Sequence, residues 1–208
     1  MPWYDLLNIG LLILVWIPVF MNVAAIASNR KYWLFFFTVY TLTELVSLPI
    51  SLGGESNLWV YSVSKPIQFL LLIAYLSKSI KLSRMKITLL LSSGVILSVF
   101  LFFSQEMDTY HSHAEALHGA IIVALCVMYF YKFIAAEAPI KINQSEFWYC
   151  SALFIFYGTN LCINGSLDFL IKNNLPLAQK LFFGLVINSY IFYALTLNAL
   201  LVNYQRTR

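Results

Sequence analysis

The amino-acid sequence predicts an all-α, polytopic integral membrane protein. It predicts a seven-transmembrane-helix bundle with the N-terminus outside and the C-terminus cytoplasmic. Composition is the first observation: of 208 residues, 61% are hydrophobic and 11% are charged, whereas about a quarter of a soluble domain is charged. The second is length, because seven stretches reach the roughly 20 apolar residues that a helix needs to cross the hydrocarbon core. The third is the placement of lysine and arginine in alternate connections between these stretches.

The seven predicted spans follow one another with short connections, so we expect one transmembrane domain over residues 1–208 and no separate soluble domain. Gly53 and Gly54 mark the turn between the second and third spans. Pro18, Pro49 and Pro66 lie inside spans, where proline kinks a helix and frees backbone carbonyls. The predicted spans are roughly 7–27, 32–52, 58–77, 86–104, 114–135, 146–171 and 177–203.

The basic residues predict the orientation. Only Lys172 and Lys180 fall on the side that contains the N-terminus, together with the acidic Glu55 and Asp108. Short cytoplasmic loops are enriched in lysine and arginine, so the N-terminus is predicted to be outside, in a multi-pass protein of the plasma or inner membrane. The basic residues on the opposite side are Arg30, Lys31, Lys78, Lys81, Arg84, Lys86, Lys132, Lys141, Arg206 and Arg208.

Two opposite charges stand inside predicted spans. Glu44 in the second span and Lys65 in the third each lie about eight residues from the Gly53-Gly54 turn, or ~12 Å along a helix. Because the two spans are antiparallel neighbours, these side chains can meet at the same depth. Charges inside a bilayer usually face the bundle interior or water. The pair is predicted either to fix helix packing or to belong to a site for a solute, an ion or a proton.

Amide side chains extend this polar group. Asn160, Asn164 and Asp168 are spaced by four residues and share one face of the sixth span, and Asn188 lies in the seventh. Such amides also join helices within membranes. Their position in the outer half of the bundle favours an outward-facing polar pocket. The predicted ligand-binding residues are Glu44, Lys65, Asn160, Asn164, Asp168 and Asn188.

A second group precedes the fifth span. If the helix begins by His111, then His111, Glu115 and His118 lie on one helical face. Two imidazoles and a carboxylate can bind zinc, and histidines can also sense pH. A fourth ligand is not evident, so a surface zinc ion is the only cofactor that the sequence suggests, and otherwise none is expected.

Spans two and six are weakly similar. Trp33 and Trp148 open them, and Glu44 and Asn160 follow 11 and 12 residues later. Either chance similarity between aromatic-rich helices explains this, or the chain has a three-plus-one-plus-three arrangement in which the fourth span links two repeats.

Signatures of familiar seven-helix families are missing. A retinal protein needs a lysine midway along its last helix, but Lys180 lies at the outer end of that span, so retinal is not expected. The Asp-Arg-Tyr and Asn-Pro-x-x-Tyr patterns of G-protein-coupled receptors do not occur, nor does the Pro-Gln signature of small sugar transporters. Intramembrane zinc hydrolases resembling ceramidases would need histidines deep within spans. We therefore recognise no family.

These observations favour a small-solute or ion transporter or channel-like protein. The alternative is a receptor or sensor subunit that binds an external ligand and signals through a protein partner at its cytoplasmic loops. A lipid-modifying enzyme is the least favoured, because no nucleophile and base stand in a legible arrangement. Expected partners are the lipid bilayer, the solute or ion and, for a homo-oligomer, a second copy. Nucleic acid is not expected, because the basic residues lie in short loops.

Overall fold

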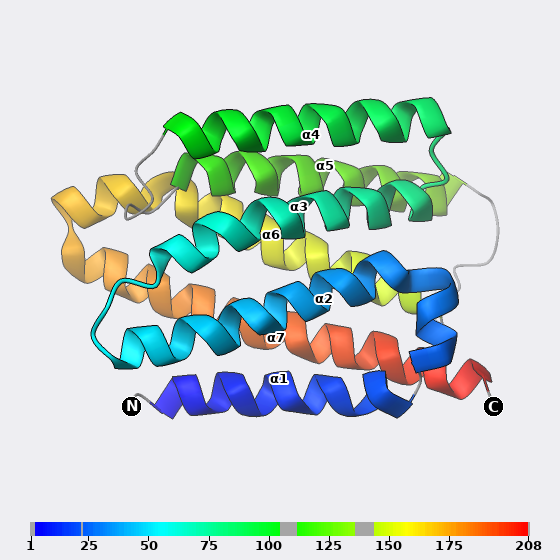
Figure 1. Cartoon of the computed structure of the whole chain (residues 1–208), viewed down its shortest axis with the longest axis horizontal. Coiled ribbons are helices and arrows are strands. Elements are labelled where there is room, and N and C mark those ends of the chain that lie inside the picture. Colours follow the sequence, from blue (N-terminus) through cyan, green and yellow to red (C-terminus); the bar gives the residue numbers. More distant parts are fainter. Residues whose placement is uncertain (1–2, 22, 105–111, 136–143, 208) are drawn as a thin grey trace.

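The computed structural model describes residues 3–21, 23–104, 112–135 and 144–207, and all regular secondary structure in these ranges is α-helical. Side chains at 1–9, 21–30, 101–113, 136–143, 168, 172 and 203–208 lie outside the description. The helices (Figure 1) are α1 (Trp3–Met21), α2 (Val23–Leu52), α3 (Leu58–Ser79), α4 (Arg84–Ser104), α5 (Ser112–Ala135), α6 (Ser145–Asn173) and α7 (Leu175–Thr207).

Successive helices run in opposite directions, so the connections alternate between two ends of the molecule (Figure 1). One end carries the α3–α4 turn with Lys78 and Lys81, and the last turn of α5 with Lys132. We call it the basic end. The α2–α3 turn, with Gly53 and Gly54, lies at the opposite end, where Gly54 adopts a φ of 79° that only glycine accommodates without strain.

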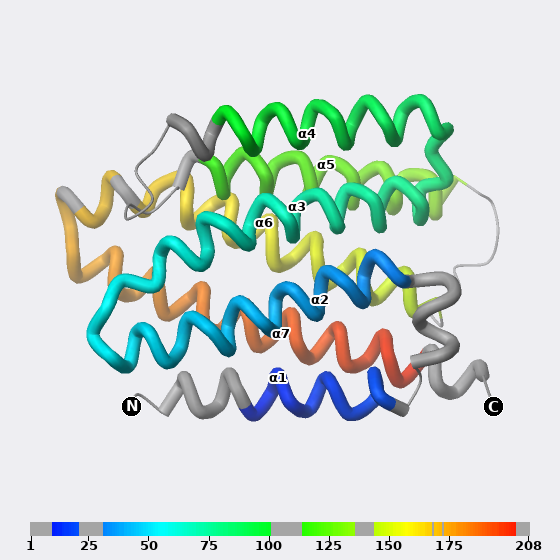
Figure 2. Tube along the Cα trace, viewed as in Figure 1, coloured from blue at the N-terminus to red at the C-terminus, as the bar shows by residue number. Residues whose placement is uncertain are grey.

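Six helices form a closed ring. α1 packs on α2, α2 on α3, α3 on α5, α5 on α6, α6 on α7, and α7 returns to α1. α4 packs chiefly against α3, outside this ring, and the trace in Figure 2 shows it at the edge of the molecule. The arrangement therefore has two groups of three consecutive helices, with α4 joining them.

Aromatic residues fill the middle of the ring and its half toward the basic end. The Trp33 ring stacks on Phe37 with centroids 5.2 Å apart and lies 4.4 Å from Tyr149. Phe192 and Tyr193 continue the cluster from α7, and all five residues are almost fully buried. Each such ring removes a large apolar area from its surroundings. This aromatic core therefore holds α2, α6 and α7 together.

Among the residues whose side chains the structure describes, four helical segments are long and apolar enough to cross a membrane, judged by length and composition: Lys31–Leu52, α3, Ala114–Ala135 and Leu175–Val202. The described part of α1 adds a shorter apolar helix, Gly10–Phe20. Large apolar side chains such as Phe20 and Ile96 point outward and are about 70% exposed, as expected for a surface in contact with lipid. These features indicate a membrane protein with transmembrane helices. α6 is less apolar because it carries several amide, hydroxyl and glycine residues.

The predicted end of the first span is wrong. The span was expected over 7–27, but α1 ends at Met21 and α2 already begins at Val23. The segment Val23–Ala27 is apolar and rich in alanine, so hydropathy extends the first span through it. Alanine also favours a helix, and here it belongs to the next one. The second predicted span, 32–52, begins nine residues after α2 does, although it agrees with the apolar segment Lys31–Leu52 within that helix. The remaining predicted boundaries lie within four residues of those of the helices.

Candidate functional site

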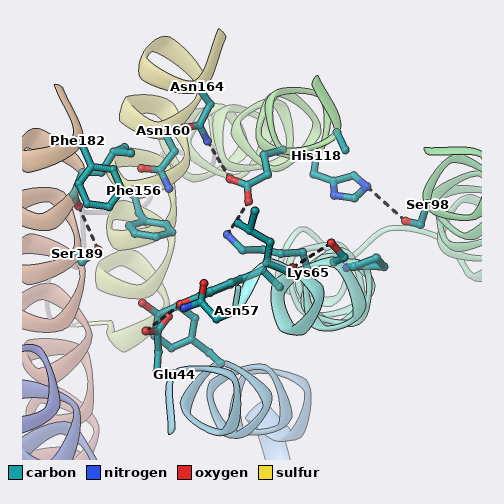
Figure 3. A pocket seen from close by; sticks show the side chains of 18 residues that line it. Glu44, Asn57, Lys65, Ser98, His118, Phe156, Asn160, Asn164, Phe182 and Ser189 are labelled. Atoms are coloured by element: carbon teal, nitrogen blue, oxygen red, sulfur yellow. Dashed lines mark hydrogen bonds and ion pairs between the residues drawn. The ribbon is translucent and has the colours of Figure 1, made fainter. Parts of the chain in front are cut away.

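A cavity of about 440 Å³ opens among the helices in the half of the ring away from the basic end (Figure 3). Its volume is within the range of small-molecule pockets. Side chains of α2, α3, α5, α6 and α7 form its walls, and Ser98 of α4 reaches it. The lining residues are Tyr40, Glu44, Asn57, Leu58, Tyr61, Ser62, Lys65, Pro66, Ser98, Ala114, Glu115, His118, Phe156, Asn160, Asn164, Phe182, Leu185 and Ser189.

A polar network of Lys65, Glu115 and Asn164 forms part of one wall of this cavity. Lys65 Nζ of α3 lies 3.3 Å from Glu115 Oε1 of α5, and Asn164 Nδ2 of α6 donates a hydrogen bond of 2.9 Å to Glu115 Oε2. Both charged side chains are largely covered, with 30% of Lys65 and 18% of Glu115 exposed. Because α3 adjoins α5 in the ring, this network ties α3 to α5 and α6, although α4 stands between α3 and α5 in the sequence.

The sequence analysis predicted Glu44 as the partner of Lys65, whereas the ion pair described for Lys65 is with Glu115. Glu44 lines the same cavity from α2, and Glu44 Oε2 accepts a hydrogen bond of 3.4 Å from the Tyr61 hydroxyl. That hydroxyl also lies 3.0 Å from Ser47 Oγ. The prediction compared only helices that follow one another in the chain, so it could not include α5.

Two of the predicted amides join α6 to α7 beside the cavity. Asn188 Nδ2 donates to Asn160 Oδ1 at 3.0 Å and to the Phe156 carbonyl at 2.9 Å. Asn160 lines the cavity, while the buried Asn188 braces the wall behind it. The side chain of Asp168, the last residue of the predicted stripe, lies outside the described residues.

Asn164 offers the cavity an unused acceptor. The residue is 3% exposed and lines the cavity. Its Nδ2 is bonded to Glu115, while its buried Oδ1 has no hydrogen-bond partner within the described part of the chain. A buried polar atom without a partner costs about 1–3 kcal/mol. An N–H or O–H group of a bound molecule would recover this free energy.

The remaining walls combine negative charge with aromatic faces. Among the described residues, two carboxylates, Glu44 and Glu115, and one ammonium group, Lys65, line the cavity, so the formal charge of this lining is negative with neutral histidine. Tyr61 provides one of the aromatic faces, and Lys65 Nζ lies 5.9 Å from the centre of its ring. Aromatic faces and carboxylates both attract cations. The aromatic lining consists of Tyr40, Tyr61, Phe156 and Phe182.

The predicted zinc ligands take other roles where they are described. The His118 ring stacks on Phe69 at 4.0 Å, and its Nε2 lies 3.3 Å from Ser98 Oγ, while Glu115 pairs with Lys65. Among the described residues, no three His, Cys, Asp or Glu side chains form a group suited to a metal. His111 lies outside these residues, so the zinc site stays a prediction.

The cavity ends at the aromatic core. The Tyr40 and Tyr193 hydroxyls are 3.0 Å apart and connect α2 to α7 below the cavity. Tyr40 lines the cavity, and Tyr193 is 1% exposed. The Phe192 ring packs beside Tyr40 at 6.1 Å, and the buried Trp33 lies nearer the basic end of α2. In this conformation the aromatic core separates the cavity from the basic end.

Most of the lining residues were not predicted as pocket residues, and the polar ones among them include Tyr61, Glu115 and His118. Tyr61 precedes Lys65 by four residues, so helical periodicity places the two on one face and could have identified it. Glu115 and His118 stand three residues apart at the start of an apolar helix. That position indicates inward-facing polar groups as readily as a surface metal site.

Comparison with known proteins found no matching family model, no significantly similar curated protein and no significantly similar solved structure.

Proposed function

We propose that this protein is a small-solute transporter or channel-like protein whose cavity faces outward and binds a small organic cation. In this proposal all seven helices cross the membrane, with the N-terminus outside and the C-terminus in the cytoplasm. The antiparallel order of the helices (Figure 1) and the lysines gathered at the basic end support this topology, because basic residues accumulate on the cytoplasmic side. The less apolar α6 would cross within the ring, where α5 and α7 cover its amides.

One observation carries the proposal: polar and charged groups from several helices converge on a cavity whose described lining residues include one more carboxylate than ammonium groups. Such a cavity is expensive to keep within a membrane. If these polar groups served only to pack the helices together, we would expect them to be paired with one another, with no cavity beside them. The open acceptor of Asn164 and the aromatic walls add two further means of holding a cation that donates hydrogen bonds.

The proposed roles follow from position. Glu44 would attract the cation, the Tyr61 ring would cover it, and Asn164 Oδ1 would accept one of its N–H groups. Lys65 and Glu115 would hold the wall in shape. For transport, the Tyr40–Tyr193 contact has to open toward the basic end, since it closes the cavity floor. Conformational changes of this kind are how alternating access proceeds.

A receptor or sensor subunit is the second candidate, and the closed aromatic core favours it, because a ligand could bind without a path to the other side. Its signal would pass to a protein partner through the loops at the basic end. An enzyme that acts on lipid is a third reading, without an observation that favours it.

Uptake by the purified protein in proteoliposomes tests the proposal. The probes are radiolabelled putrescine, choline and glycerol, which separate a cation with N–H donors, a cation without them and a neutral solute. We expect saturable uptake of putrescine, weaker uptake of choline and background uptake of glycerol. Glu44→Gln should weaken putrescine binding about 10- to 100-fold, since a hydrogen bond to a charged group contributes about 1.5–3 kcal/mol.

Glu55→Gln is the matched control, because Glu55 is exposed in the α2–α3 turn at the same end and does not line the cavity. Uptake of putrescine that is equal in Glu44→Gln and wild-type protein would refute the role of the cavity. Saturable binding of putrescine that depends on Glu44, without uptake, would instead support the receptor. Both variants should keep the wild-type unfolding temperature, which excludes misfolding.

A further inference from the structure

A second cavity, of about 670 Å³, lies at the basic end of the molecule. It is separate from the first, since the two share no lining residue and the aromatic core lies between them. The last turn of α3, the α3–α4 turn and the last turns of α5 form most of its walls. The lining residues are Tyr32, Tyr75, Lys78, Ser79, Ile80, Lys81, Tyr129, Lys132, Phe133, Gln144 and Glu146.

Positive charge dominates this cavity. Among the described lining residues, Lys78, Lys81 and Lys132 stand against one carboxylate, Glu146, so the formal charge of this lining is +2. Lys132 Nζ donates one hydrogen bond of 3.1 Å to the Ile80 carbonyl, and an ammonium group has three donors. Lys132 is therefore fixed against the α3–α4 turn by one of its three donors.

Lys81 has a left-handed backbone conformation that is strained for a lysine. Leu82 N–H donates to the Ser77 carbonyl and Lys81 N–H to the Lys78 carbonyl, both at 3.0 Å. This is the Schellman pattern that ends a helix, and its left-handed position normally holds glycine. Lys81 occupies that position with a φ of 56°. A strained residue at a cleft often reflects function.

The depth and lining of the cavity suit a phosphate group. The cavity lies at the ends of α3 and α5, which is the level of the lipid headgroups for helices that cross a membrane, and the buried Tyr75 and Tyr129 line it about one turn further in than Lys78 and Lys132. Basic cavities between helices on the cytoplasmic side are suited to phosphate-bearing headgroups. Lysine also binds free phosphate by the same charge and hydrogen bonds.

We propose that the cavity lined by Lys78, Lys81 and Lys132 is a binding site for a phosphate-bearing anion, supplied by an anionic lipid headgroup or by a soluble phosphate. This site does not depend on the proposed function of the first cavity. Each lysine near the phosphate should strengthen binding about five-fold.

Native mass spectrometry of the full-length protein in a neutral detergent tests the site. The protein is titrated separately with phosphatidylglycerol, with phosphatidylcholine of the same chains, and with glycerol 3-phosphate. We expect one tightly bound phosphatidylglycerol, weakened about five-fold by Lys81→Gly and by Lys132→Gln. Lys86→Gln is the matched control, since Lys86 is exposed at the same end but does not line the cavity.

Lys81→Gly separates ligand binding from folding, because glycine removes the strain at φ 56°. Its unfolding temperature without ligand should rise while its affinity for phosphatidylglycerol falls. Equal lysine-dependent binding of glycerol 3-phosphate would make soluble phosphate the source and leave the site in place. Two results would overturn the proposal. The first is equal binding of the two lipids with no lysine-dependent binding of glycerol 3-phosphate. The second is a loss of phosphatidylglycerol affinity in Lys86→Gln as large as in Lys81→Gly.

Discussion

The ion pair between Lys65 and Glu115 makes the sharpest prediction about how the bundle is held together. At 3.3 Å, two unit charges attract by ~5 kcal/mol at an effective dielectric constant of 20. The desolvation of both groups and the exposed fractions of 30% and 18% reduce this value. We therefore expect a coupling free energy of about 1–2 kcal/mol between the two side chains.

A double-mutant cycle measures this coupling. Lys65→Met should lower the free energy of unfolding by about 2–3 kcal/mol, because the covered Glu115 loses its counter-ion. Glu115→Gln should cost less, about 1–2 kcal/mol, since an amide oxygen can still accept the hydrogen bond from Asn164. The double variant should be about 1–2 kcal/mol more stable than the sum of the two losses predicts.

The assay is reversible unfolding of the purified protein by SDS in mixed micelles, followed by circular dichroism. Lys65→Met combined with Glu55→Gln is the control pair, because Glu55 is exposed in the α2–α3 turn. Its effects should add to within about 0.5 kcal/mol. If the Lys65 and Glu115 variants add equally well, the pair contributes nothing to stability and the reasoning is refuted.

Two further predictions use the same unfolding assay. Gly94→Val should lower the free energy of unfolding by about 1–3 kcal/mol, because a Cβ at Gly94 would already lie 3.2 Å from Ile73 Cδ1. Gly165→Ala should instead raise it by up to about 1 kcal/mol, because a Cβ at Gly165 meets nothing within 4 Å. Equal effects of the two variants would contradict the packing of α4 on α3. Tyr40→Phe should lower the free energy of unfolding by about 1–2 kcal/mol, because it leaves the buried Tyr193 hydroxyl without its partner at 3.0 Å. Adding Tyr193→Phe should lower it little further. If the double variant loses as much as the two single variants together, the hydroxyls do not interact.

The sequence was sufficient to predict the helices and the membrane character. Both follow from a local property, because the length of the apolar segments sets which of them form helices in a membrane. Short connections then make successive helices antiparallel. Glu44, Lys65, Asn160 and Asn164 could also be identified as members of one polar region, and all four line the first cavity. A charge or amide within an apolar stretch is visible without knowledge of its neighbours, because burying it in lipid is costly.

The sequence alone could not identify the partners of these groups. Helical periodicity specifies which face a residue occupies, but it carries no information about which other helix that face meets. Glu115 lies 50 positions beyond Lys65 in the chain, and only the packing of α3 against α5 brings the two within 3.3 Å. The same packing placed His118 on Phe69, and α4 brings Ser98 to Nε2 of that imidazole. Local chemistry thus determined which residues are polar and buried, whereas the order of helices around the ring, set by the fit of many side chains at once, decided which of them meet.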